Sequence, residues 1–200
     1  MEAHITDYRQ AHQVLCNPHL RQSLYDAGDV VMNGVLLTLH GRKHVDRRHL
    51  ALKVFKRDYA LYYEREVFPS TLKATLAPLR GEPVIDALAF GRSVSMNLTA
   101  DFAGIDRDTD PQTTSTLQRL TETFGEGATL VHSKRNHDEV RAEVRAALEE
   151  YRELFLNPSI ARRQTLIDAH QQGRLDEANL PRDMLTVLLA NIAELRLDED

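Results

Sequence analysis

A dense cluster of ionisable side chains follows Gly41. Seven of the eight residues from Arg42 to His49 are ionisable, and six of them are basic. The whole chain carries a formal net charge of −5. A local basic cluster on an acidic protein indicates a bound anion, although a solvated, positively charged helix face has the same composition.

The spacing inside this cluster favours two of its members. We expect a helix to begin near Gly41, and residues four apart in a helix lie on the same face. His44 and Arg48 then lie one turn apart, so that both can donate to one acceptor. The sequence therefore predicts a specific anion-binding pair and not only a region of positive charge.

Other reactive patterns are poorly supported. No Gly-x-Ser-x-Gly sequence occurs, and Gly125-Glu126-Gly127 lacks the Lys-Ser/Thr ending of a phosphate-binding loop. His132 and His137 have no nearby Cys and no zinc-binding spacing, so we expect no metal site there. We expect Cys16 to be a small buried hydrophobic residue, because nothing beside it would lower its pKa. We assign no catalytic residue.

The elements that position these groups are predicted to be helices. Leu, Ala, Arg and Glu dominate, and β-branched residues do not form alternating runs. The sequence predicts a mainly α protein with seven or eight helices and very little sheet, arranged as one domain over residues 1–200. Residues 4–15 are predicted to form a short extended piece followed by a helix with Thr6 as its N-cap, and a helix that starts near Gly41 is predicted to end before the break at 56–58. The other predicted helices cover about 59–78, 86–103, 117–124, 138–156, 159–172 and 181–195.

Several boundaries have local signals. Gly104 is predicted to end the helix over 86–103, and Asn157-Pro158 is predicted to end the helix over 138–156. Pro69 predicts either a kink or a first-turn position, and not the end of the helix over 59–78. Residues 106–116 are polar and are predicted to form a surface loop.

Composition also limits the partners and the location. No apolar run approaches the roughly 20 residues that cross a bilayer, and the first ten residues do not resemble a signal peptide. One Cys excludes an internal disulfide, which favours a cytoplasmic protein. The net charge argues against binding of nucleic acid by the whole surface. We therefore expect neither a membrane nor a nucleic acid as partner.

The segment from Leu36 to Phe55 resembles the helix C region of soluble bacterial cytochromes P450. It reads Leu-Leu-Thr-Leu-His-Gly-Arg-Lys-His-Val-Asp-Arg-Arg up to residue 48, with Phe55 further on. By this resemblance, His44 and Arg48 hydrogen-bond the haem propionates. His40 departs from the family, which often has Asp there. The resemblance extends from helix B, ending at Asn17-Pro18, to the start of helix H at 181–192.

The resemblance implies a haem-thiolate monooxygenase, which inserts one oxygen atom from O₂ into an organic substrate and receives electrons from a ferredoxin-type partner. It also implies that helix I, helix K and the haem-ligand Cys loop lie outside these 200 residues. The chain would then be an incomplete cytochrome P450-like domain. We expect it to be inactive alone, and either to self-associate or to require its C-terminal half.

Two alternatives remain open from the sequence. One is a non-enzymatic helical regulatory protein that uses residues 42–49 to bind a ligand or DNA. Against it, the basic helix is not preceded by the short helix and tight turn of the usual DNA-binding arrangement. The other is a helical protein that binds haem without catalysis.

Overall fold

The computed structural model describes residues 4–17 and 19–192, and all regular structure in these ranges is helical. When continuous segments are joined, the described part of the chain holds seven main helices, together with a short helical segment over 26–32 and isolated 3-10 turns. The prediction of a mainly α fold is confirmed. The α-helices are α1 (Tyr8–Leu15), α2 (Asp29–Met32), α3 (Gly41–Ala51), α4 (Arg57–Tyr62), α5 (Phe68–Leu76), α6 (Ala87–Ala103), α7 (Pro111–Ala128), α8 (His137–Tyr151), α9 (Asn157–Gln171) and α10 (Met184–Ala190).

Two parts of the sequence prediction lie outside the described residues. These are Pro18 of the predicted Asn17-Pro18 helix end and residues 193–195 of the predicted last helix. The observed last helix, α10, begins at Met184, three residues after Pro181.

Two helices pass through a proline by way of a π-helical segment. The π segment Tyr63–Val67 joins α4 to α5 just before Pro69, and Arg152–Leu156 joins α8 to α9 just before Pro158. The prediction that Asn157-Pro158 ends a helix is therefore wrong. Proline lacks an N–H and crowds the carbonyl four residues earlier, and wider i→i+5 pairing in the preceding turn accommodates this without ending the helix.

Helix α7 is longer than predicted at both ends. The Asp110 carboxylate accepts hydrogen bonds from the backbone N–H groups of Gln112 and Thr113, at 2.9 and 3.0 Å. Pro111 takes the first helical position, where its missing N–H has no cost. The polar segment 106–116 is thus only partly a loop.

Helix α6 has the predicted boundaries. The Asp86 carboxylate caps its first turn, and Gly104 ends it with φ +87°. A β-carbon at Gly104 would lie 2.5 Å from Oδ1 of Asp183. Glycine at position 104 therefore provides both the left-handed backbone and the space for Asp183.

The core has two adjoining parts, and Phe124 of α7 packs against both. One part lies among α6, α7, α8 and the π segment at 152–156, and the other lies among α2, α7 and α8. Close approach of α7 and α8 requires Gly127, because a β-carbon there would lie 2.5 Å from Cγ2 of Val144. The buried hydrophobic members of the two parts are Ala100, Ile105, Leu117, Leu120, Ala147, Phe155, Leu130, Val140 and Val144.

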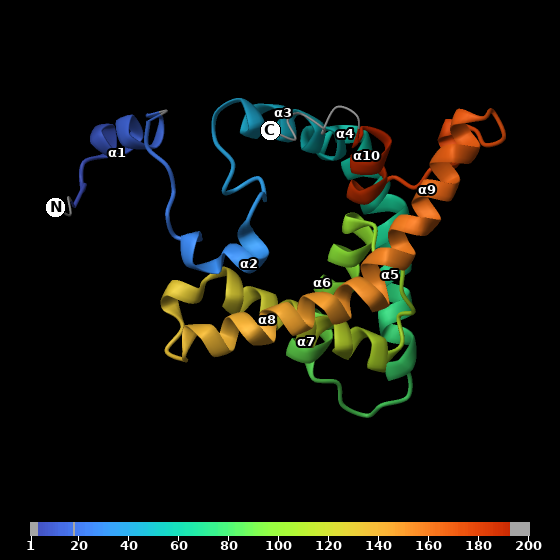
Figure 1. The fold of residues 1–200 in the computed structure, drawn as a ribbon. Coiled ribbons are helices and arrows are strands. Elements are labelled where there is room, and N and C mark those ends of the chain that lie inside the picture. Colours follow the sequence, from blue (N-terminus) through green and yellow to red (C-terminus); the bar gives the residue numbers. More distant parts are fainter. Residues whose placement is uncertain (1–3, 18, 193–200) are drawn as a thin grey trace.

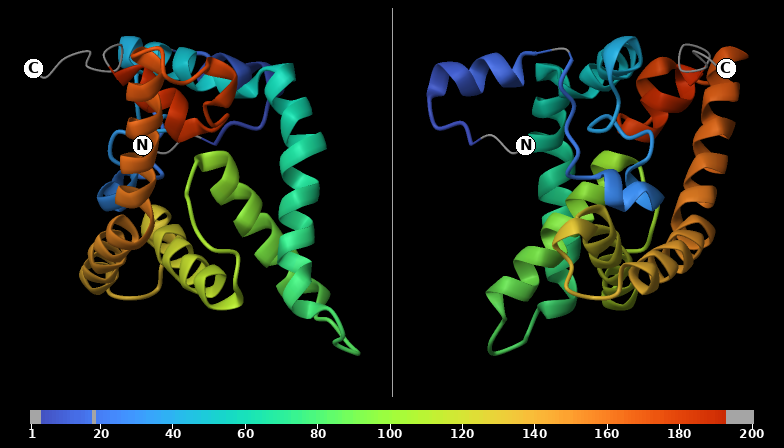
Figure 2. Two further views of the ribbon diagram at one scale, coloured as in Figure 1. Left: turned by 90° about the vertical axis from the view of Figure 1, so that its right-hand side faces the viewer. Right: turned by 60° about the vertical axis from the view of Figure 1, so that its left-hand side comes forward.

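The helices form an open arch and not a closed bundle (Figure 1). Helices α3 and α10 lie at one end and α7 and α8 at the other, and the long rods α4–α5 and α8–α9 connect the two ends (Figures 1 and 2). The chain exposes 14059 Å², whereas a folded monomer of this mass is expected to expose about 9,600 Å². No helix in the described ranges is long and apolar enough to cross a membrane.

Candidate functional site

The predicted basic helix is α3. Gly41 begins it with φ +57°, directly after the extended residue His40. His44 and Arg48 both lie within this regular helix, four residues apart, so the structure places them on one face as predicted. His44 is half-buried and Arg48 is exposed.

The basic side chains of α3 differ in whether they have an acidic partner. The Nε of Arg42 donates to both carboxylate oxygens of Asp46, at 2.8 and 2.9 Å. Neither His44 nor Arg48 has a side-chain hydrogen bond or ion pair to any residue in the described ranges. The acid within the cluster therefore neutralises Arg42 and leaves the predicted pair available for an external acceptor. The other basic residues of α3 without a side-chain hydrogen bond or ion pair in the described ranges are Lys43, Arg47 and His49.

The C-terminal end of α3 is anchored to α10. Leu50 and, in the following 3-10 turn, Val54 are buried. Nζ of Lys53 donates to Oδ1 of Asn191, the residue that ends α10, at 2.7 Å. The orientation of α3 therefore depends on the position of α10.

Helix α10 is in turn held by a buried ion pair. Asp183 accepts a hydrogen bond from the N–H of Thr186 at 2.7 Å and so caps α10. The same carboxylate accepts a hydrogen bond from Nη2 of Arg163, which lies in α9, at 2.9 Å. Nη1 of Arg163 donates to Asp106 at 2.6 Å, in the segment between α6 and α7. Burial opposes the charge on Arg163, but hydrogen bonds to Asp183 and Asp106 outweigh this effect and raise its pKa.

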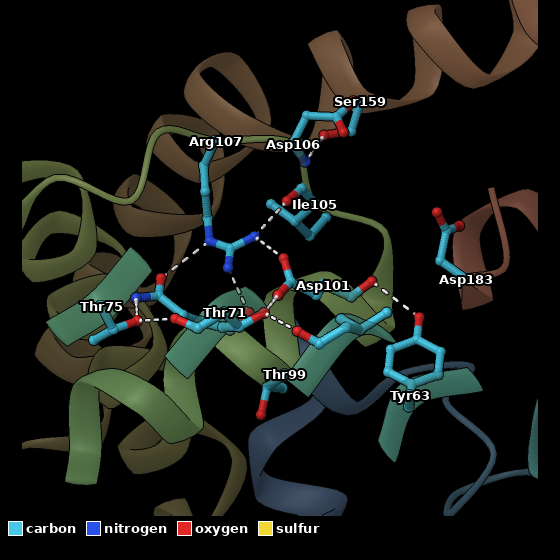
Figure 3. A network of polar contacts seen from close by, with 12 residues as sticks. Tyr63, Thr71, Thr75, Thr99, Asp101, Ile105, Asp106, Arg107, Ser159 and Asp183 are labelled. Atoms are coloured by element: carbon cyan, nitrogen blue, oxygen red, sulfur yellow. Dashed lines mark hydrogen bonds and ion pairs between the residues drawn. The ribbon is translucent and has the colours of Figure 1, made fainter. Parts of the chain in front are cut away.

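A second polar network joins α5, α6 and the segment after Gly104 (Figure 3). The guanidinium of Arg107 donates to Oδ1 of Asn97 at 3.2 Å, to Oδ1 of Asp101 at 2.9 Å and to two backbone carbonyls. Thr71 donates to the other oxygen of Asp101. The amide of Asn97 donates to Thr75 at 3.1 Å. Because its donors are satisfied within the fold, we assign this network to stability and not to ligand binding.

Tyr63 connects this network to the entrance of α10. Its hydroxyl donates to the carbonyl of Arg182 at 2.7 Å and lies 3.3 Å from that of Asp101. Burial, and secondarily the charge of Asp183, raises the pKa of Tyr63 well above its usual value of 10.0. A neutral phenol that donates to backbone is consistent with a structural role.

Sequence reasoning missed the partners of Arg107 and Arg163. The sequence predicts a surface loop that includes Arg107, yet the side chain of Arg107 is 3% exposed. The Arg163–Asp183 pair spans 20 residues and the Arg163–Asp106 pair spans 57, and no local pattern predicts contacts at such separations. The Asp110-Pro111 pair was the one local signal that could have placed α7 correctly.

The prediction that Cys16 is buried is wrong. Cys16 is exposed at the end of α1, and its sulfur lies 3.8 Å from Nε2 of His12. The reason is that α1 packs against no other helix closely enough to bury any of its residues. In the described ranges, no group of three or more His, Cys, Asp and Glu residues could hold a metal ion.

Comparison with known proteins found no match. No family model matches the sequence, and neither a curated protein nor a solved structure matches the chain.

Proposed function

We propose that this chain is the N-terminal helical part of a haem-thiolate monooxygenase of the cytochrome P450 type, in which α3 holds the haem propionates. The observation that carries the proposal is that His44 and Arg48 share one face of α3 and are both without an internal hydrogen-bond acceptor in the described ranges. They lie one turn apart, next to an Arg42–Asp46 pair.

The residues of α3 fit the carboxylate side of a haem. Arg48 supplies a permanently charged fork of N–H donors, and His44 supplies a ring donor one turn away. Together they would neutralise two adjacent carboxylates through charge-assisted hydrogen bonds and fix their orientation relative to the helix axis. When bound, a thiolate-ligated haem supplies the activation of O₂. The proposal assigns the thiolate to a segment outside residues 1–200 and not to Cys16, which lies at the end of α1, apart from α3 (Figure 1).

The large exposed surface supports the proposal that this chain is an incomplete haem domain. The chain exposes about 1.5 times the area expected for a monomer of its mass. Apolar side chains on α3 and in the turn that follows it contribute to this area, including Val45, which is 52% exposed, and Leu52, which is 47% exposed. Further segments of the same enzyme would cover these side chains. An organic substrate and a ferredoxin-type electron donor belong to the same proposal.

Haem titration followed by absorbance spectroscopy tests this proposal. We expect the chain to bind haem weakly, and we expect its reduced, CO-treated complex to lack the red-shifted Soret band of a thiolate-ligated haem. A thiolate-type band from this chain alone would contradict the assignment of the thiolate to another segment. Absence of haem binding, together with DNA binding that weakens with salt, would overturn the proposal in favour of a regulatory protein.

A further inference from the structure

An aromatic groove lies beside α4, α5 and α6. Its volume is about 550 Å³, and Glu64 is the one charged residue among those that line it. The ring of Phe102 lies 5.7 Å from that of Phe55 and 5.4 Å from that of Tyr63. The lining residues are Val54, Phe55, Tyr59, Ala60, Tyr63, Glu64, Phe68, Leu98, Thr99 and Phe102.

Helix α1 has an apolar face without a packing partner. Tyr8, Ala11 and Leu15 fall on one side of this eight-residue helix, and none of its residues is buried. Tyr8 is 80% exposed and Leu15 is 86% exposed. Figures 1 and 2 show α1 apart from the other helices, linked to them by the segment before α2. An isolated helix of this length is marginal in water, so α1 requires a surface to pack on.

The side chains of the two surfaces are available for burial in a dimer. Tyr8 and Leu15 of α1 are 80% and 86% exposed, and Phe55 of the groove is 65% exposed. A standard interface buries only about 800 Å² on each partner. Exchange of an arm between two copies is a common route to such a dimer, because the interaction occurs twice.

We propose that α1 of one copy of this chain packs into the aromatic groove of a second copy. An amphipathic helix with apolar anchors at i, i+3 and i+7 suits a groove of this kind. The charges are complementary, because Arg9 of α1 and Glu64 of the groove each lack an ion-pair partner in the described ranges. The inference goes beyond the proposed function and does not depend on haem binding.

Sedimentation velocity over a dilution series tests the dimer. We expect the wild-type chain to dimerise, and we expect Tyr8→Ser combined with Leu15→Ser to weaken dimerisation by more than about 100-fold, because the two arms together lose four buried apolar side chains. Phe55→Ser should weaken it about tenfold. Val84→Ser is the matched control, because Val84 is 84% exposed and lies outside both surfaces, so its dimerisation constant should be unchanged.

A charge exchange separates specific docking from a folding defect. Arg9→Glu and Glu64→Arg should each weaken dimerisation about threefold to tenfold, and the double variant should restore it to near the wild-type value. Circular dichroism should show unchanged helix content in all three. A monomeric wild-type chain, additive losses in the double variant, or a dimer sensitive only to Val84→Ser would each overturn the proposal. A monomer that still binds haem would leave the proposed function standing.

Discussion

The carboxylate of Asp183 accepts hydrogen bonds from both Nε and Nη2 of Arg163, at 3.1 and 2.9 Å, with each residue 4% exposed. Asp183 is also the N-cap of α10, and α10 supports the end of α3 through the Lys53–Asn191 hydrogen bond. One buried ion pair therefore connects the long α8–α9 rod to the helix that carries the candidate anion site.

Replacement of Arg163 by Met should destabilise the protein by about 3–5 kcal/mol, because it leaves the Asp183 carboxylate buried without a counter-charge. Urea unfolding followed by circular dichroism measures the loss. Arg162→Met is the matched control, because Arg162 binds the same Asp106 but its side chain is 58% exposed, and exposed pairs contribute about 1 kcal/mol or less. Equal losses in the two variants would contradict the importance of burial.

Replacement of Arg48 by Ala should lower haem affinity about tenfold or more, through the loss of charge-assisted hydrogen bonds to a carboxylate. His44→Ala should also lower it. Titration at fixed ionic strength measures both effects. Lys43→Ala removes one positive charge from the same helix but outside the predicted pair, so it controls for general electrostatic attraction. A loss as large in Lys43→Ala would show a diffuse basic surface instead of a specific pair.

Two glycines of α7 should respond in opposite directions to alanine. A β-carbon at Gly125 meets nothing within 4 Å, so Gly125→Ala should stabilise the protein by about 0.5–1 kcal/mol through helix propensity. A β-carbon at Gly127 meets Val144 at 2.5 Å, and Gly127→Ala should destabilise by about 1–3 kcal/mol. Denaturant midpoints measure both changes. The Gly127→Ala loss should be smaller in a Val144→Ala background, and an unchanged loss there would refute the contact.

Alkaline pH should destabilise the protein partly through Tyr63. The pKa of Tyr63 is raised above 10.0, so below pH 10 its phenol is protonated in both the folded and the unfolded state. Above pH 10 the unfolded state loses this proton first, and the free energy of unfolding falls by less than about 1.4 kcal/mol per pH unit, the limit for one proton. Unfolding of Tyr63→Phe at pH 9 to 11 should show a shallower decline. An identical slope would assign the effect to Tyr59 and Tyr151, whose pKa values burial also raises.

The sequence predicted those features that depend on neighbours along the chain. Helix α3, the capped helix α6 and its end at Gly104 have local signals, and so does the common face of His44 and Arg48. The pairing of Arg163 with Asp183 depends on how two helices cross, and the sequence pattern does not contain that information. The sequence pattern predicts a helix end at Asn157-Pro158, but the π turn over Arg152–Leu156 accommodates the proline and the helix continues. Haem binding by α3 stays a prediction.

The π segment Arg152–Leu156 has a consequence for helical phase. Wider turns hold about one extra residue, and one extra residue changes the direction in which later side chains project by about 100°. Val144 and Ala147 face the core before the segment, and Ser159, Arg163 and Ile167 are buried after it. The π segment therefore sets the angular phase at which Arg163 meets Asp183. If the same residues formed a regular α-helix, the Arg163 guanidinium would be rotated by about 100° away from Asp183, whereas deletion of one residue between 152 and 156 should restore a regular α-helix and keep the ion pair.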